Sequence, residues 1–154
     1  MTVRFTINNT SLHYSISKFP FTVNSFPSPY QVDVISTILE YQALTIDADI
    51  LIIDQKVLDA YPLSASCNGP SFLVDATEDN KNMNTVLSII DFFIDNQVSK
   101  GSKVIAIGGG IVQDLCACAC SLFRRGQPFL YLPTTTLGQL DSCVGAKCAV
   151  NTYK

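Results

Sequence analysis

The sequence predicts an α/β domain in which helices flank a parallel β-sheet, preceded by an N-terminal β-hairpin. Short apolar runs of strand length alternate along the chain with segments of helical periodicity, which is the pattern of strands joined by right-handed crossovers. The third such run, residues 104–107, is followed at once by Gly108, Gly109 and Gly110. Glycines in that place let the backbone turn tightly from a buried strand into a helix.

The composition indicates a globular protein with a substantial core. Of the 154 residues, 47% are hydrophobic and 15% are charged. The formal net charge of −3 argues against a nucleic-acid groove or an anionic membrane surface as the main partner. No apolar run reaches the roughly 18 residues of a membrane span, and the N-terminus lacks a signal-peptide core. We therefore expect a cytoplasmic protein.

The N-terminal third is expected to hold the hairpin and one helix. Residues 3–23 alternate between polar and apolar side chains around turn-forming residues 8–10, which favours two paired strands. The lone histidine, His13, is expected on an exposed face of this hairpin. Several prolines then mark an irregular connection, and the apolar spacing of residues 32–44 favours a helix.

The rest of the chain predicts a Rossmann-like succession of strands and helices. Residues 81–99 show the clearest helical periodicity, with Asp79 or Asn80 as the N-terminal cap and Lys100-Gly101 at the end. The apolar runs are expected to be parallel strands buried on both faces. The strands are predicted at 49–54, 71–75, 104–107 and 128–132, and the other helices at 56–61 and 111–123.

Six cysteines occur, three of them at alternate positions of the predicted helix 111–123. Residues two apart on a helix point apart, so Cys116 and Cys118 make a poor metal-binding pair. Cys116 and Cys120 share a face, but no other Cys or His is placed to complete a site. We expect these three to be small, buried, reduced thiols and assign no metal ligand to the chain.

Polar residues are expected to gather at the carboxyl ends of the strands, where open α/β sheets bind ligands. Asp54, the loop at 75–81 and the glycines at 108–110 all fall there. The helix after the glycines offers free N–H groups to a phosphate. The motif departs from the usual dinucleotide fingerprint at Gln113, and no Gly-Lys-Ser/Thr follows as in a P-loop. A purely structural strand-to-helix turn therefore stays an equal alternative.

A second polar segment follows the strand at 128–132. Residues 134–136 are threonines, and Asp141, Ser142 and Lys147 come shortly after them. A carboxylate six residues from an ammonium group, beside hydroxyl groups, can orient a polyol and neutralise a phosphate. The alternative is a solvated loop with an Asp–Lys surface pair, which the scarcity of other charge nearby disfavours.

Over residues 101–151 the chain resembles the 3-dehydroquinate synthase family, the NAD-dependent sugar-phosphate cyclases. That family carries Gly-Gly-Gly-x-x-x-Asp, then Arg-Gly, then Pro-Thr-Thr-Leu-x-x-x-Asp-Ser-x-x-Gly-x-Lys. The resemblance is weaker over 45–100 and is one of layout alone over 1–44. The matching residues are Gly108-Gly109-Gly110, Asp114, Arg125-Gly126, Pro133-Thr134-Thr135, Leu137, Asp141-Ser142, Gly145 and Lys147.

The resemblance implies a dehydroquinate synthase-like N-terminal domain and an enzyme, a carbon–oxygen lyase. Such enzymes cyclise a phosphorylated seven-carbon keto sugar acid with loss of phosphate, in the shikimate pathway of aromatic amino acid biosynthesis. NAD is used transiently, and a divalent metal ion, zinc or cobalt, holds substrate hydroxyls. The implied partners are a small phosphorylated sugar and, for the full-length family, a second subunit, with no nucleic acid and no membrane.

The resemblance also implies roles for single residues. Asp141 and Lys147 would touch substrate, and Arg125 would reach a phosphate across a dimer interface. The implied cofactor contacts are Asp54, Glu78 and Lys81 at the adenosine end, Gly109, Gly110 and Asp114 near the pyrophosphate, Thr134, Thr135, Leu137 and Ser142 at the nicotinamide, and Lys154.

Departures from the family pattern leave the substrate open. Asp54 is followed by Gln-Lys where the family often has x-Asn, and Lys147 follows Gly-Ala where the family has Gly-Gly. The latter segment leans toward cyclitol-forming relatives such as 2-epi-5-epi-valiolone synthase. Further alternatives are a non-catalytic NAD-binding half-domain and, less favoured, an iron-containing polyol dehydrogenase relative, which would place a lysine where Ala117 stands.

The expected domain organisation also follows from the resemblance. Family members carry a second, helical domain that supplies the metal ligands, a Glu and two His. We therefore expect residues 1–154 to be the NAD-binding N-terminal domain, truncated near 151–154, without the C-terminal metal-binding helical domain. Alone it is expected to turn over little and, with an apolar face uncovered, to associate or to be poorly soluble.

Overall fold

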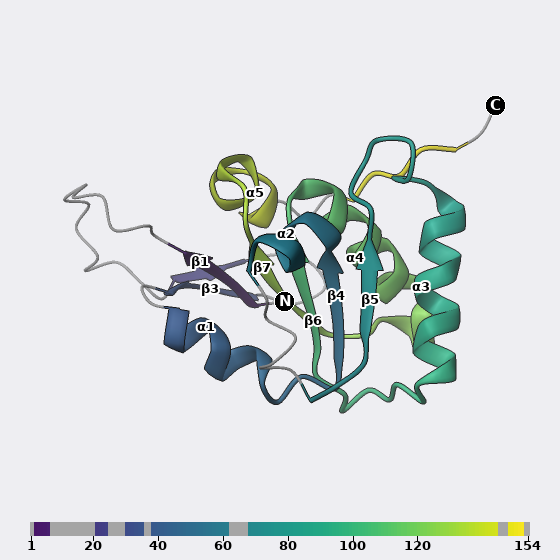
Figure 1. The fold of residues 1–154 in the computed structure, drawn as a ribbon, viewed down its shortest axis with the longest axis horizontal. Helices are drawn as coiled ribbons and strands as arrows, with labels where there is room; N and C mark the ends of the chain where they lie inside the picture. Colours follow the sequence, from purple (N-terminus) through teal and green to yellow (C-terminus); the bar gives the residue numbers. More distant parts are fainter. Residues whose placement is uncertain are drawn as a thin grey trace.

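The computed structural model describes residues 2–6, 21–24, 30–35, 38–61, 68–144 and 148–152. These residues form a seven-stranded sheet flanked by helices (Figure 1). The strands are β1 (Thr2–Thr6), β2 (Phe21–Val23), β3 (Tyr30–Ile35), β4 (Ile50–Asp54), β5 (Ser71–Val74), β6 (Val104–Gly108) and β7 (Phe129–Pro133). The helices are α1 (Ile38–Thr45), α2 (Gln55–Ala60), α3 (Met83–Asp95), α4 (Gly110–Leu122) and α5 (Thr136–Leu140), with short 3₁₀ turns η3 (Phe123–Arg125) and η4 (Ser142–Val144).

The sheet has a point at which the direction of its connections reverses. The strand order is β2-β3-β1-β7-β6-β4-β5, and every neighbouring pair is parallel except β2 with β3. From β4 the chain passes to β5 on one side, and β6 then returns to the other side of β4. The carboxyl ends of β4 and β6 therefore mark a topological switch point, the place where ligands bind in open α/β sheets.

Alternate residues of the central strands bury against opposite faces of the sheet. Ile50 and Ile52 of β4 pack in a cluster with α3 and α4, whereas Leu51 and Ile53 pack with side chains from α1 and α2. All four are at most 1% exposed. The expectation that this strand is parallel and buried on both faces is thus confirmed, and it follows from the period-two alternation of strand side chains.

The edge strand β5 differs from its prediction as a buried strand. Ser71 and Leu73 are exposed, and only Val74 is fully buried. β5 lies last in the strand order, so one of its long edges carries no described strand. An apolar run of this length fits either an interior or an edge strand, and its place in the sheet decides the burial.

Two predictions for the N-terminal third are corrected. β1 lies between β3 and β7 and pairs in parallel with both, so it is not the first strand of a hairpin over 3–23. The antiparallel pair is instead β2 with β3. Residues 32–35, predicted to begin a helix, belong to β3, and the helix begins at Ile38. Residues 7–20 of the predicted hairpin, which include His13, lie outside the described residues.

Helix α3 forms where predicted, but with other ends. Asn82, not Asp79 or Asn80, caps it: its Oδ1 accepts a hydrogen bond from the N–H of Thr85 at 3.1 Å. The helix ends at Asp95, and Gln97 has a left-handed φ of 54°, well before the predicted stop at Lys100-Gly101. A single left-handed residue ends a helix as a glycine would.

Candidate functional site

Three segments meet at the switch point. Asp54 ends β4, the glycines begin with the last residue of β6, and Thr134 follows β7. The N–H of Thr134 donates to the carbonyl of Gly108 at 2.9 Å. A Cβ on Gly108 would lie only 3.3 Å from the Cβ of Asp54. The predicted residues at the ends of these three strands are therefore brought together.

Asp54 joins the end of β4 to the start of α2. It is partly buried, and its Oδ1 accepts a hydrogen bond from the N–H of Lys56 at 3.0 Å, which caps α2. Capping by a carboxylate is also favourable because the helix N-terminus carries partial positive charge. The acid is thus held at the carboxyl edge of the sheet.

The glycine turn is shaped by close contacts. A Cβ on Gly108 would lie 2.6 Å from Cγ2 of Val112, and one on Gly109 would lie 3.0 Å from Cγ2 of Thr135. Gly109 caps α4 without a side-chain hydrogen bond. Backbone N–H groups at the start of α4 therefore meet no capping side chain from this residue, which suits an anion.

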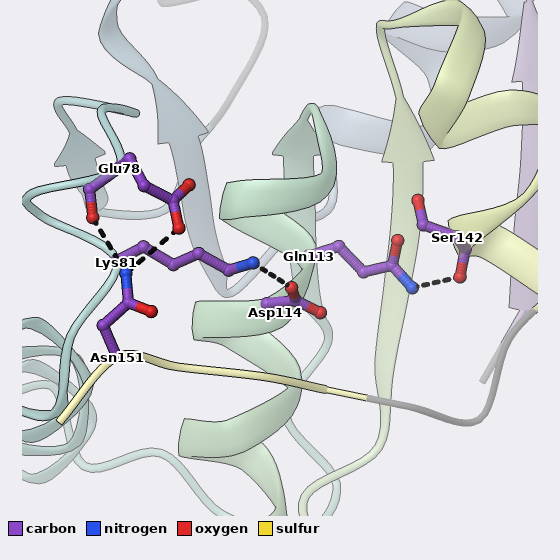
Figure 2. Close-up of polar contacts among 6 residues, drawn as sticks. All are labelled: Glu78, Lys81, Gln113, Asp114, Ser142 and Asn151. Atoms are coloured by element: carbon purple, nitrogen blue, oxygen red, sulfur yellow. Dashed lines mark hydrogen bonds and ion pairs between the residues drawn. The ribbon is translucent and has the colours of Figure 1, made fainter.

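Two pairs of polar residues lie on one side of α4. Lys81 Nζ is 2.7 Å from Oδ2 of Asp114, and the two side chains are only 18% and 17% exposed. Asn151 donates from Nδ2 to Oε1 of Glu78 at 3.0 Å and from its backbone N–H to the carbonyl of Lys81 at 2.8 Å. Figure 2 shows these residues together, so three of the implied cofactor contacts are neighbours here.

The segment after β7 is a short helix rather than the predicted loop. Thr135 caps α5 by accepting from the N–H of Gly138 at 3.1 Å. The hydroxyl of Tyr131 donates to the carbonyl of Gly108 at 3.0 Å. A Cβ on Gly138 would lie 3.0 Å from that hydroxyl, so the glycine lets α5 approach β7 closely.

On the other side of α4, Gln113 contacts the end of this segment. Its Nε2 donates to the backbone carbonyl of Ser142 (Figure 2). Gln113 is 2% exposed, and Ser142 is partly buried. The glycine turn and the segment 141–144 are thereby joined by a side chain.

The remaining predicted residues are placed differently. Asp141 and Leu137 are exposed, Leu137 by 68%. Arg125 precedes β7, whose first residue pairs with the first residue of β6, so it lies at the opposite edge of the sheet from the glycines. A five-residue strand separates the two edges by about 15 Å. Lys147 and Lys154 lie outside the described residues.

The prediction of buried, free thiols is confirmed for some of the cysteines. Cys116, Cys120 and Cys143 are buried and free, and the sulfurs of Cys116 and Cys120 are 3.8 Å apart. Cys118 is only partly buried and Cys148 is exposed. In the part of the chain that the structure describes, no group of three or more Cys, His, Asp or Glu side chains could hold a metal ion.

Burial in the core raises the pKa of several thiol and phenol groups. It raises the pKa of the Cys143 thiol from 9.0 to about 11, and it raises the pKa of the Tyr131 phenol as well. The pKa of Cys116 is raised by its hydrogen bond with Cys120 and by burial. The folded chain therefore keeps protons on these groups that the unfolded chain releases.

We expect the protein to lose stability at alkaline pH. Because the folded pKa of Cys143 is raised, its contribution is complete below pH 9.0 and is lost as the pH rises through about 11. Urea unfolding at pH 8, 9, 10 and 11 measures this fall. Cys143→Ala should make the decline shallower over the same range. An equally steep decline in this variant would contradict the assignment.

Fold and site together define an open α/β domain with an acid, glycines and hydroxyl groups at the carboxyl ends of its strands. A family profile described as 3-dehydroquinate synthase N-terminal matches residues 71–154. The chain therefore belongs to the 3-dehydroquinate synthase family, as the sequence motifs predicted.

No helix in the described ranges is long and apolar enough to cross a membrane.

Relatives of known name agree with this membership. The 3-dehydroquinate synthase of Clostridium tetani (strain Massachusetts / E88) is 38% identical over an alignment of 109 residues that covers 68% of this chain and 29% of that protein. That of Enterococcus faecalis (strain ATCC 47077 / OG1RF) is 43% identical over 81 residues, 53% and 23% of the two chains. The chain thus spans less than a third of the length of these relatives.

Solved structures show the same fold. A 2-epi-5-epi-valiolone synthase from Streptomyces hygroscopicus subsp. jinggangensis 5008, with NAD⁺ and Zn²⁺ bound, matches with a TM-score of 0.65 and 33% identity, over 70% of this chain and 32% of that one. A 2-deoxy-scyllo-inosose synthase complexed with carbaglucose-6-phosphate, NAD⁺ and Co²⁺ matches with a TM-score of 0.72 over 86% and 40%. At 21% identity the second likeness concerns the fold alone.

Sequence reasoning missed the residues that hold the site together. Tyr131 and Asn82 were assigned only to a strand and a helix, and Gln113 was noted only as a departure from the dinucleotide fingerprint. The available signals were a tyrosine inside an otherwise apolar strand and a polar residue in the first turn of a small-residue helix. Both suggest a buried polar group that needs a partner.

Proposed function

We propose that residues 1–154 form the NAD-binding unit of a sugar-phosphate cyclase of the 3-dehydroquinate synthase type. The observation that carries the proposal is the meeting of Asp54, the glycine turn and Thr134 at the switch point. Dinucleotides bind at such points because a helix N-terminus and an acid at a neighbouring strand end face the same crevice. Family membership agrees with this assignment.

The residues present fit such a cofactor. Gly109 leaves the start of α4 without a side-chain cap, so N–H groups there can bind the pyrophosphate. Asp54 would accept hydrogen bonds from the adenosine ribose, as acids after a strand do in dinucleotide sites. Glu78 and Lys81 would contact the adenosine end, and Asp114 would anchor the cofactor beside Lys81.

The segment beyond β7 would face the reacting end. Thr134, Thr135, Leu137 and Ser142 would line the nicotinamide, which, when bound, accepts and returns a hydride at a substrate carbon. Asp141 and Lys147 would orient the polyol. Their charges suit a hydroxyl group and a phosphate respectively.

Arg125 is proposed to act on a second copy of the chain. It lies at the opposite edge of the sheet from the glycine turn, so within one chain it is remote from the proposed substrate. A homodimer in which Arg125 reaches the partner's phosphate site would account for this placement. The described residues offer no metal ligand set, and no step is assigned to a metal ion held by them.

The proposed reaction is cyclisation of a phosphorylated seven-carbon keto sugar acid with elimination of phosphate. The names of the sequence relatives support it. Formation of another cyclitol is the second candidate, and the 33% identity to a 2-epi-5-epi-valiolone synthase supports that candidate. Both candidate reactions require the same residues to bind NAD. Measuring NAD binding therefore tests the part of the proposal that the two reactions have in common.

Calorimetric titration of the chain with NAD tests the proposal. We expect binding, and we expect Asp54→Ala to weaken it by about tenfold, because an acceptor for the ribose is lost. Asp54→Ser is the matched control for folding, because serine also caps helices and can hold the start of α2. Absence of binding by the unsubstituted chain would overturn the proposal. Equal affinity of the unsubstituted chain and both variants for NAD would show that Asp54 does not contact the cofactor.

A further inference from the structure

The side chain of Gln113 lies between the two halves of the candidate site. Gln113 and Asp114 are consecutive on α4, so their side chains leave the helix in directions about 100° apart and meet different neighbours (Figure 2). Asp114 pairs with Lys81 on one side, whereas Gln113 donates to the carbonyl of Ser142 on the other. Gln113 is therefore placed to connect the start of α4 with the segment 141–144.

Of the two polar atoms of the Gln113 amide, Nε2 has a hydrogen-bond partner among the described residues and Oε1 has none. The residue is 2% exposed, and its Oε1 is buried without a hydrogen-bond partner among the described residues. A neutral hydrogen bond contributes modestly to stability, and an unpaired buried acceptor costs at least as much. For stability alone, an apolar side chain of similar volume would serve equally well. Unlike an apolar side chain, the amide fixes the position of one carbonyl oxygen, because its N–H donates a hydrogen bond to that oxygen.

The carbonyl that it fixes belongs to a segment with few other hydrogen bonds to the rest of the domain: Ser142 contacts the Tyr131 hydroxyl of β7, and Cys143 is buried in the core. Ser142 begins η4, and its Oγ lies 3.5 Å from the carbonyl of Gly138, while Sγ of Cys143 donates to the carbonyl of Gln139 at 3.0 Å. These contacts stay within α5 and η4. The bond from Gln113 instead crosses to α4, within one turn of the glycines.

We infer that Gln113 is a positioning residue that sets Asp141 and Ser142 against the glycine turn. It thereby determines how the site receives the nicotinamide end of the dinucleotide and leaves the pyrophosphate end unaffected. The inference rests on the proposed function for the ligand. The positioning itself rests on the contact between Gln113 and Ser142 and on the orphaned Oε1.

Gln113→Met is the informative variant, because methionine keeps the length and volume of the side chain and removes the donor. Gln127→Met is its matched control. Gln127 is also buried, also has an unpartnered Oε1 and also donates to a backbone carbonyl, that of Ser102 at 3.0 Å, but it precedes β7 at the far edge of the sheet. Gln113→Glu adds a second test, because it would place an acceptor against the Ser142 carbonyl.

The three variants are compared with the unsubstituted chain by thermal unfolding, by amide hydrogen exchange and by titration with NAD and with ADP-ribose, which lacks the nicotinamide. For Gln113→Met we expect an unchanged or higher melting temperature and faster exchange at 141–144. We expect NAD binding weaker by about five- to tenfold, and ADP-ribose binding changed by less than about twofold. Gln113→Glu should weaken NAD binding further, and Gln127→Met should change neither ligand.

Two results would overturn the inference. One is a lower melting temperature in Gln113→Met with both ligands weakened equally, which is the result for a merely structural residue. The other is unchanged exchange at 141–144. If the unsubstituted chain binds neither ligand, the proposed function and the ligand role of Gln113 both fail. The exchange rates of the ligand-free variants then decide separately whether Gln113 positions the segment.

Discussion

Replacing Gly108 by alanine is expected to lower the free energy of unfolding by about 2–3 kcal/mol. The added Cβ would lie 2.6 Å from Cγ2 and 2.8 Å from Cβ of Val112, and 3.3 Å from Cβ of Asp54. Val112 is fully buried in the first turn of α4, so relief would require the helix start to move away from β6. Urea unfolding at neutral pH measures the loss.

Gly101→Ala is the control for this substitution. The nearest atom to a Cβ there is Oγ of Ser99 at 3.9 Å, an ordinary contact. We expect a change within about 0.5 kcal/mol, as for surface substitutions generally. A similar loss in the two variants would show that the contact with Val112 does not govern the effect.

Replacing Asp114 by alanine is expected to destabilise the protein by about 2 kcal/mol. The substitution leaves the Lys81 ammonium, whose side chain is 18% exposed, without the carboxylate that lies 2.7 Å away. Removing one partner of a fully buried pair costs about 3–5 kcal/mol, and a pair that keeps some water should cost less. Because the pair is largely shielded, added salt should reduce the effect only in part.

A double-mutant cycle isolates the pair itself. Lys81→Met combined with Asp114→Ala should be less destabilising than the sum of the single changes, by about 1 kcal/mol or more. Asp91→Ala is the control, because Asp91 is an exposed acid on α3 and should change stability by less than about 0.5 kcal/mol. Simple additivity in the cycle would mean that the two charges do not stabilise each other.

Much of the fold could be predicted because its central strands carry their own signal. The apolar runs that became β4 and β6 are long enough only for a strand, and both faces of these strands are buried. The glycines mark the following turn because a side chain at Gly108 would collide with Val112. These features depend on residues that are close together in the chain, so they can be predicted from the sequence alone.

The candidate site was only partly predictable. Asp54 and Thr134 could be placed because one ends a strand and the other directly follows one, and parallel strands end at one edge of a sheet. The pair of Lys81 with Asp114 was not predicted, because no local pattern relates two residues so far apart in the chain. It joins the turn before α3 to α4, two elements whose relative position depends on packing.

By itself the sequence determined the family, the strand–turn–helix unit around Gly108 and the acids and hydroxyl groups at strand ends. The tertiary structure decided which partner each element found. Residues 32–35 have an apolar spacing that suits a helix or a strand, and pairing with β1 made them a strand. Gln113 became a contact of Ser142 only because α4 and η4 pack together across 29 positions of sequence. Periodicity reports local geometry, whereas pairing and docking depend on contacts between residues far apart in the chain.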